Sequence, residues 1–352
     1  MAQKIIIIGG GIIGAATAYH LSRQGTQVTV LDAGQGRATA ASFGWVNASY
    51  SANEDHFHLR VAGLQAWAKM IADFGLQPEG RGSIAWDQDA DGLMAQHKQL
   101  SDLGYPVEVL SSAEFQQLEP AIVSPPDISL RFPSELVVDA NHAVGDLLKR
   151  SGAMVFRGVH VERIEETAVG PIVKTALGDL PADQVIVAAG TGTEDLLSGF
   201  ETSPPLKSSP TLVVTTDAVE KVSSHVLASP VGDIRQRADG AFIMPTDIGH
   251  QSSETDLSGV DLQDTVDDAM HRLCGLFPHL DLSPAAMNLA WRPMPVDGLP
   301  IVGRITDRIY TAVMHSGVTL GAVMGELVAD EVIHGSTNRT QSFLSAYRPD
   351  RF

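Results

Sequence analysis

The N-terminal part of the chain alternates short apolar runs with glycines. Residues 5 to 8 are four consecutive isoleucines, which is typical of a parallel strand buried on both faces. Residues 12 to 23 predict a helix, and the segment QVTVLD at residues 27 to 32 predicts a second strand. Gly9, Gly11 and Gly14 follow the first strand with the spacing G-x-G-x-x-G, two of them in the turn and the third inside the helix. The pattern predicts a strand–turn–helix–strand unit of about 30 residues.

Two other interpretations of this stretch compete with that unit. Lys4, an apolar run and the small residues AATA have the features of a secretory signal, and uncharged residues 5 to 22 nearly reach the length of a membrane span. However, three consecutive glycines interrupt the run. Asp32 also ends the second strand about 20 residues later, where a carboxylate can accept the hydroxyls of an adenosine ribose. The complete unit favours dinucleotide binding, with a pyrophosphate at the helix N-terminus.

Beyond this unit, strands and helices do not simply continue to alternate, as a nicotinamide-dependent domain would require. Residues 33 to 51 are rich in Gly, Ala, Ser and Thr and predict a loop against an extended ligand. A helix is expected at about residues 53 to 74, with an apolar stripe made of Phe57, Val61, Leu64, Ala68 and Ile71. The sheet is expected to resume only at residues 152 to 166 and 171 to 193, where the strand VIVAA enters a second glycine turn.

Composition and charge exclude several classes of function. The 352 residues are 44% hydrophobic and 19% charged, which is ordinary for a globular protein. The net charge of -18, without a basic cluster longer than scattered pairs, argues against binding to nucleic acid or to anionic lipid. Cys274 is the only cysteine, so no disulfide framework is possible within the chain and a reducing, cytoplasmic location is expected.

Five segments together resemble the flavoprotein superfamily of D-amino-acid oxidase, glycine oxidase and sarcosine oxidase. They span nearly the whole chain, and they are IIIIGGGIIGAATAYHL, ATAASFGWVN, VIVAAGTGT, AWRPMPVDGLPIVGR and AVMHSGVTLGAVMGELVAD. The resemblance implies an α/β fold with a discontinuous, Rossmann-like FAD-binding domain and an inserted α+β substrate domain built on a mixed or antiparallel sheet.

The expected domain boundaries follow from the same resemblance and from the pattern of the middle of the chain. Short strands such as SIAWD, TLVVTTD and AFIMPT alternate there with amphipathic helices, for example at residues 261 to 276. The FAD-binding domain is expected at residues 1–79, 134–203 and 291–352. The substrate-binding domain is expected at residues 80–133 and 204–290, where it would cover the flavin.

Sarcosine oxidases hold their flavin through a covalent link to a cysteine, but this sequence has no cysteine near the segment HSGVTL. The FAD is therefore expected to be noncovalent. The family places this C-terminal turn beside the flavin ring, where the N-H groups of a helix N-terminus stabilise negative charge on the reduced ring. The residues expected to contact FAD are Gly9, Gly11, Ile12, Ile13, Gly14, Asp32, Ala33, Arg37, Ala41, Ser42, Gly44, Trp45, Asn47, Val161, Ala189, Gly190, Gly192, Arg292, Gly317, Val318, Thr319 and Leu320.

Two residues are candidates for catalysis, and each has a structural alternative. Arg292 stands in an apolar, turn-forming stretch and could pair with a carboxylate for structural reasons alone. In the amino-acid-oxidising members of the family the arginine of this motif clamps the substrate carboxylate, which a guanidinium can hold through two hydrogen bonds. His315 precedes the Gly317 turn and could contact substrate or ring, or only the backbone.

The resemblance implies oxidation of an amino acid or secondary amine at its C-N bond. A hydride would pass to flavin N5, and the imine would hydrolyse in water. Two alternatives stay open: an accessory flavoprotein subunit of a heteromeric amine dehydrogenase, and a nicotinamide-dependent dehydrogenase. The expected partners are a small amine or amino-acid substrate and an electron acceptor, which could be O2, a quinone or a carrier protein. An oligomer is possible, and no integral membrane segment is expected.

The sarcosine oxidases carry a lysine over the flavin that activates oxygen, but this sequence has no lysine after Lys221. The nearest basic candidate in the corresponding region is His250. The missing lysine tilts the expectation slightly toward a dehydrogenase that passes electrons to a quinone or a carrier protein. No metal site is expected, because His56 and His58 face different directions on a helix and His271 with Cys274 lacks further ligands.

Six residues could line a substrate pocket or belong to the core: Trp45, Tyr50, Phe242, Met244, Met294 and Met314.

Overall fold

A computed structural model defines the fold, and it describes residues 2–248 and 257–352. His250 lies outside the described residues. Within these two ranges, no helix has the length and apolar character needed to cross a membrane.

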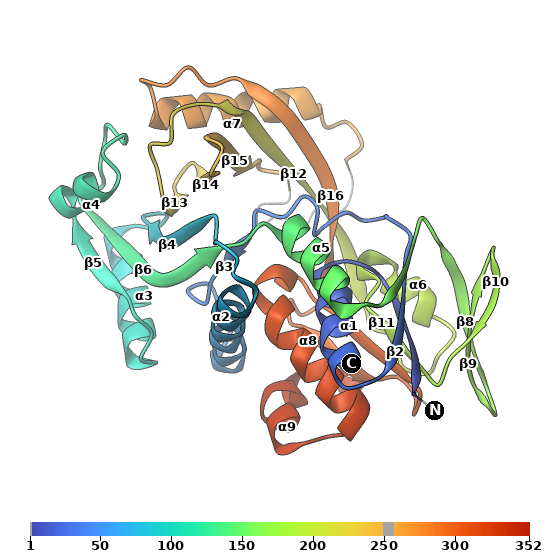
Figure 1. Cartoon of the computed structure of the whole chain (residues 1–352). Helices are drawn as coiled ribbons and strands as arrows, with labels where there is room; N and C mark the ends of the chain where they lie inside the picture. The colour runs from blue at the N-terminus through green and yellow to red at the C-terminus, as the bar shows by residue number, and fades with distance from the viewer. Residues whose placement is uncertain (1, 249–256) are drawn as a thin grey trace.

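A six-stranded sheet, called here the first sheet, carries the N-terminal unit (Figure 1). Its spatial order is β17 (Ile301–Arg304), β18 (Ile309–Val313), β11 (Gln184–Val187), β1 (Lys4–Ile8), β2 (Gln27–Asp32) and β7 (Met154–Arg157). All neighbouring strands are parallel except β17 and β18. Each isoleucine of β1 is at most 5% exposed, as predicted for a strand covered on both faces. The pairing of β2 with β7 confirms that the sheet resumes after residue 152.

Part of the resumption predicted at residues 152 to 193 is different in the structure. The strands β8 (Val161–Thr167), β9 (Gly170–Thr175) and β10 (Gly178–Pro181) form a separate antiparallel sheet of three strands. Their tight connections make hairpins, and consecutive strands joined by short turns pair with each other rather than with a distant sheet. Of the strands between residues 152 and 193, β7 and β11 alone join the first sheet. Helix α6 (Thr193–Leu197) follows β11.

Four helices pack together beside the first sheet (Figure 1). Helix α1 (Ile12–Arg23) contacts both α5 (Ala140–Ser151) and α8 (Gly317–His334), and α2 (Glu54–Phe74) contacts α8. Short helix α9 (Asn338–Leu344) follows α8. Asp139 caps α5, because its side chain accepts hydrogen bonds from the backbone N-H of Asn141 and His142 at 2.9 Å.

Glycines allow α1 and α8 to approach closely. A Cβ atom added to Gly321 would lie 2.7 Å from Ile12 Cγ1, and one added to Gly325 would lie 2.5 Å from Ala16 Cβ. Larger side chains at these positions would separate the two helices. Because each helix begins directly after a strand of the first sheet, this contact brings their N-termini, and the glycine turns before them, to the same edge of the sheet.

The apolar stripe predicted for α2 is wrong at one position. Ala68 is exposed, whereas Trp67 is 1% exposed and packs in the core. Arg60 is also buried on this helix, at 5% exposed. The buried face of α2 runs through Arg60, Gly63 and Trp67, so the predicted stripe lies to one side of its centre and Ala68 falls on the exposed side. An arginine is unexpected on that face, because arginines are rarely buried without a partner.

A second sheet of nine strands, called here the roof sheet, extends from beneath α7 (Leu262–Leu276) at the top of Figure 1 to the left side of the molecule. Its spatial order is β16 (Pro284–Pro295), β12 (Leu206–Ala218), β15 (Ala241–Pro245), β14 (Gly232–Gln236), β13 (Val226–Ser229), β4 (Gly80–Ala85), β6 (Ile128–Val137) and β3 (Trp45–Val46), with β5 (Glu108–Ser111) also paired to β6. Most neighbours are antiparallel, but β4 and β13 are parallel, so the sheet is mixed as expected. Helices α3 (Ala90–Asp102) and α4 (Ser112–Leu118) connect its strands β4, β5 and β6.

The roof sheet includes segments from both sides of the predicted domain boundaries. The boundaries after residues 133 and 290 fall inside β6 and β16. Each of these strands therefore runs from one predicted domain into the other, and the division into domains stays a prediction. The physical consequence is that the roof is joined to the FAD-side segments through continuous strands rather than through flexible linkers alone.

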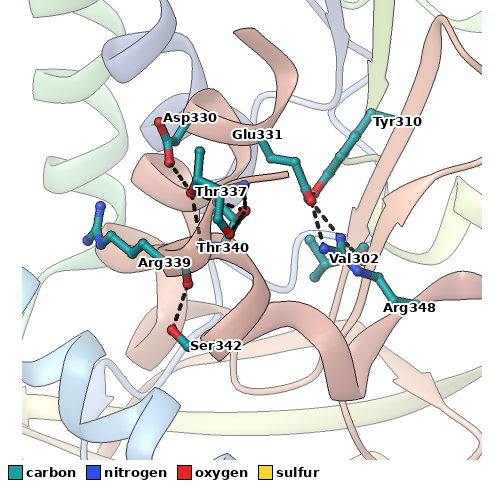
Figure 2. A network of polar contacts seen from close by, with 9 residues as sticks. All are labelled: Val302, Tyr310, Asp330, Glu331, Thr337, Arg339, Thr340, Ser342 and Arg348. Carbon is teal, nitrogen blue, oxygen red and sulfur yellow. Dashed lines mark hydrogen bonds and ion pairs between the residues drawn. The ribbon is translucent and has the colours of Figure 1, made fainter. Parts of the chain in front are cut away.

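A buried polar network fastens the end of α8 to the sheet and to the C-terminal segment (Figure 2). Glu331 accepts a hydrogen bond from Tyr310 OH, on β18, and two from Arg348, at 2.7 Å and 2.6 Å. Arg348 and Tyr310 together hold the pKa of the Glu331 carboxyl below its ordinary value, although burial acts in the opposite direction. The carboxylate is thus ionised and well paired, and α8 is held in place at the end opposite the glycine turn.

Candidate functional site

One large cavity lies between the edge of the first sheet and the roof sheet. Its volume is about 1510 Å³, and its lining comes from segments far apart in the sequence. The turn after β1, the loop at residues 34 to 47, the turn after β11 and the turn before α8 all contribute. Strands β12 and β16 supply the roof side. An elongated ligand can therefore touch the ends of three parallel strands and the roof at once.

Most of the residues predicted from the sequence line this cavity. They are Gly9, Gly11, Ile12, Ile13, Asp32, Arg37, Ala41, Ser42, Gly44, Trp45, Asn47, Ala189, Gly190, Arg292, His315, Gly317, Val318 and Thr319. Of the six pocket candidates, Trp45, Tyr50, Met294 and Met314 line it, whereas Phe242 and Met244 are packed in the core of the roof.

Five predicted contact residues are not among the lining residues: Gly14, Ala33, Val161, Gly192 and Leu320. Gly14 lies inside α1, where a Cβ would come within 1.9 Å of Gly9 O, so it serves the packing of the turn. Val161 and Leu320 are buried in hydrophobic clusters, at 5% and 0% exposed. Arg157, four residues before Val161, lines the cavity instead.

The turn after β1 has the properties of a pyrophosphate site. Gly9 has a φ of +109°, and a Cβ there would lie 2.2 Å from Ala188 O, so the two glycine turns touch through their backbones. Gly11 at the N-cap of α1 has no side chain to accept a hydrogen bond, which leaves N-H groups of the first turn after Ile12 available to an anion. Thr39 Oγ1 accepts from Ile12 N at 3.2 Å and fixes the neighbouring loop. Asp32 lines the cavity at the end of β2, where a ribose would lie.

Arg292 extends from β16 into the cavity. It pairs in register with Ser209 of β12, and its Nη2 donates a hydrogen bond to Ser209 Oγ at 3.0 Å. Burial lowers the pKa of Arg292 below its ordinary value, but the guanidinium stays charged at neutral pH. This half-buried cation is held on a strand of the roof and faces the same cavity as the turn before α8.

Two histidines line the cavity near Arg292. His315 lines the cavity, and desolvation by the surrounding chain, followed by the charges of Arg292, Arg60 and His56, lowers its pKa to about 4. Burial, followed by the charge of Arg60, lowers the pKa of His56 to about 4 as well. His56 Nδ1 accepts from Ala52 N at 3.2 Å, which assigns the ring proton to Nε2. Both rings are therefore neutral at neutral pH.

The neutral state of His56 makes a pH dependence of stability testable. We expect stability to fall as the pH drops from about 6.5 toward 4, because the unfolded chain protonates His56 near 6.5 and the folded chain only near 4. Between about pH 7 and pH 5, thermal unfolding should show the wild type losing about 2 kcal/mol more stability than His56→Asn. His58→Asn, at an exposed site on the same helix, should match the wild type. Equal losses in the wild type and His56→Asn would contradict the assignment.

Some lining residues carry chemistry that sequence reasoning missed. Tyr50 OH donates to Asp87 Oδ2 at 3.0 Å, and burial followed by the charges of Asp87 and Asp233 raises the pKa of Tyr50 well above its ordinary value. The two aspartates come from the end of β4 and from β14, and both line the cavity. No short motif connects these positions, because the register of the roof sheet alone brings them together. Arg60 also gives no local signal, because its hydrogen-bond partner Ser316 lies 256 residues away in the sequence.

The geometry agrees with the comparisons with known proteins. The family described as FAD dependent oxidoreductase (DAO) matches residues 4–331. The chain belongs to this family. FAD is therefore the cofactor, which decides against the nicotinamide alternative, and the chain is an oxidoreductase. The donor set of the cavity suits that cofactor, because it joins a glycine turn, free helix N-H groups and an acidic strand end in one elongated groove.

Relatives and solved structures of this family extend over the whole chain. One of the subunits of opine oxidase from Agrobacterium tumefaciens (strain Ach5) is 28% identical, with 97% of this chain and 96% of that protein covered. The structure of glycine oxidase from Geobacillus kaustophilus has a TM-score of 0.86 at 22% identity and covers 100% of both chains. L-Proline dehydrogenase from P. horikoshii has a TM-score of 0.84 at 19% identity and covers 98% of both. These structures confirm the predicted fold class.

Proposed function

We propose that this FAD-dependent oxidoreductase oxidises the C-N bond of an amine that carries a carboxylate on the adjacent carbon, as amino acids do. The observation that carries the proposal is the position of Arg292, a half-buried cation on β16 that faces the cavity shared with the FAD-binding turns. Glycine and L-proline, named in two of the similar structures, each have a carboxylate beside a C-N bond. The proposal also rests on Arg292 being placed by Ser209 rather than left mobile.

The side chains would act mainly by binding and orienting the substrate. Arg292 would hold the carboxylate through its planar fork, which fixes the direction of the Cα-H bond. His56 and His315 are neutral at neutral pH, so neither adds a charge that would compete with Arg292 for the carboxylate. Bound FAD supplies the acceptor for the hydride from the substrate Cα. The imine that the substrate becomes takes up water and yields an oxo product and an amine or ammonia.

A second candidate is a role as one subunit of a heteromeric amine dehydrogenase. It is favoured by the opine oxidase relative, which matches over its full length and is named as a subunit. The absence of any lysine after Lys221 also favours an acceptor other than O2, such as a quinone or a carrier protein. In this case the chain would hold FAD and the substrate, while a partner chain would complete the route of the electrons.

Anaerobic mixing of the purified yellow protein with substrate pairs tests both candidates. Each amino acid is paired with the same amine lacking the carboxylate: proline with pyrrolidine, alanine with ethylamine, and glycine with methylamine. We expect the flavin absorbance to bleach with a carboxylated amine and not with its partner. Sarcosine, D-amino acids and opines extend the panel. Equal bleaching within a pair would contradict the role of Arg292, and bleaching that reverses with a quinone but not with air would identify a dehydrogenase.

A further inference from the structure

Helix α2 carries a buried arginine that lines the cavity beside the cofactor turn. Arg60 is 5% exposed and donates three hydrogen bonds. Its Nη1 donates to Ser316 Oγ at 2.8 Å, its Nε donates to Asn47 O at 2.9 Å, and its Nη2 donates to Asn47 Oδ1. All three acceptors are uncharged groups. The guanidinium thus bridges the loop after β3 and the residue that caps α8, and these hydrogen bonds do not neutralise its charge.

Glu135 is the carboxylate whose charge acts on Arg60, and it is engaged by other donors. It accepts hydrogen bonds from Tyr105 OH at 3.0 Å, from Trp45 Nε1 at 2.9 Å, and from Ser83 Oγ and the backbone N-H groups of residues 48 and 49. Burial lowers the pKa of Arg60 to about 10, while Glu135 opposes the shift. Arg60 therefore stays protonated at neutral pH. Its charge is available to the cavity, because a buried charge is poorly screened.

Two further contacts fasten the same face of α2 to the turn that begins α8. Trp67 Nε1 donates to Val318 O at 2.7 Å, and a Cβ added to Gly63 would lie 2.5 Å from Thr319 O. Arg60, Gly63 and Trp67 are spaced three and four residues apart, so they form one ridge on the helix. This ridge holds residues 316 to 319 rigidly.

We propose that Arg60 positions the cofactor turn and raises the reduction potential of the FAD bound there. Two-electron reduction places negative charge at the pyrimidine end of the ring, and a fixed cation stabilises that charge more than it stabilises the oxidised ring. Ser316, which Arg60 holds, directly precedes the residues proposed to face this end, Gly317–Thr319. The family match and the proposed substrate assign no role to Arg60. The inference rests on the proposed position of the ring, but not on the identity of the substrate.

The test measures the anaerobic midpoint potential against a reference dye and the Kd of the apoprotein for FAD, both without substrate. Arg60→Met should favour the oxidised over the reduced cofactor about tenfold, which is about 30 mV for a two-electron couple. Arg60→Lys should keep the wild-type potential because it keeps the charge. It should bind FAD more weakly, because an ammonium cannot form the forked hydrogen bonds. Lys69→Met, which removes one exposed charge from the same helix, should change neither value.

A wild-type potential in Arg60→Met would overturn the inference. So would an equal shift in Arg60→Lys, since the charge would then not be the cause. If Arg60→Met does not retain FAD, two other variants decide the question. Arg60→Lys must keep the wild-type potential, and Ser316→Ala, which removes one hydrogen bond and keeps the charge, must raise the Kd for FAD. Failure of either result refutes the role, whatever the bleaching panel shows about the substrate.

Discussion

Replacing Arg292 by alanine is expected to lower kcat/KM for a carboxylated amine about a thousandfold, on the order of 4 kcal/mol. Most of the effect should be a higher apparent KM, with turnover also reduced, because affinity and alignment both depend on the same guanidinium fork. Steady-state kinetics on the best substrate of the bleaching panel measure both parameters. The amine that lacks the carboxylate should react with the variant as poorly as with the wild type, since it makes no use of Arg292.

Two variants make this result specific. Arg292→Lys keeps a charge on β16 but loses the planar fork, so it should recover only part of the lost kcat/KM. Arg272→Ala removes another arginine of the cavity lining, one that is already paired with Asp247 through two hydrogen bonds of 2.8 Å and 2.9 Å. It should leave kcat/KM nearly unchanged. A similar loss in Arg272→Ala, or an unchanged specificity constant in Arg292→Ala, would refute carboxylate binding by Arg292.

Substitution of Gly9 by alanine is expected to abolish tight FAD binding. The added Cβ would lie 2.2 Å from Ala188 O and 2.7 Å from Ala188 C, and the φ of +109° is strained for any residue with a side chain. The two glycine turns would have to separate, which widens the groove where the pyrophosphate lies. We expect the Kd for FAD to rise at least about a hundredfold, or on the order of 3 kcal/mol, in a fluorescence titration of the apoprotein.

Gly25 provides the matched control. Its φ of +81° also disfavours alanine, but a Cβ there would meet nothing within 4 Å. Gly25→Ala should therefore lower stability by about 1 kcal/mol from local strain and leave the Kd for FAD unchanged. If both variants bound FAD equally well, the contact between the two glycine turns would not be what shapes the groove. Thermal unfolding of both apoproteins separates a loss of binding from a loss of folding.

Local patterns were sufficient to predict the elements that carry the cofactor. The run of isoleucines, the glycines and the helix at residues 12 to 23 agree with β1 and α1, and Asp32 ends β2. These features depend on neighbours within a few residues: side-chain burial on both faces of a strand, backbone freedom at glycine and helical periodicity. The family resemblance then indicated that the turns after β1 and β11 and the turn before α8 belong to one site, although about 300 residues separate the first from the last.

Other features required the folded chain. The hairpins of β8 to β10 form a sheet of their own instead of joining the first sheet. On α2, Trp67 is buried and Ala68 is exposed. Arg60 and Ser316, 256 residues apart, meet because α2 packs on α8. Asp87 and Asp233 meet near Tyr50 because of the register of the roof sheet. Strand register and helix packing are set by the sum of many distant contacts, and such sums leave no signature in a short window of sequence.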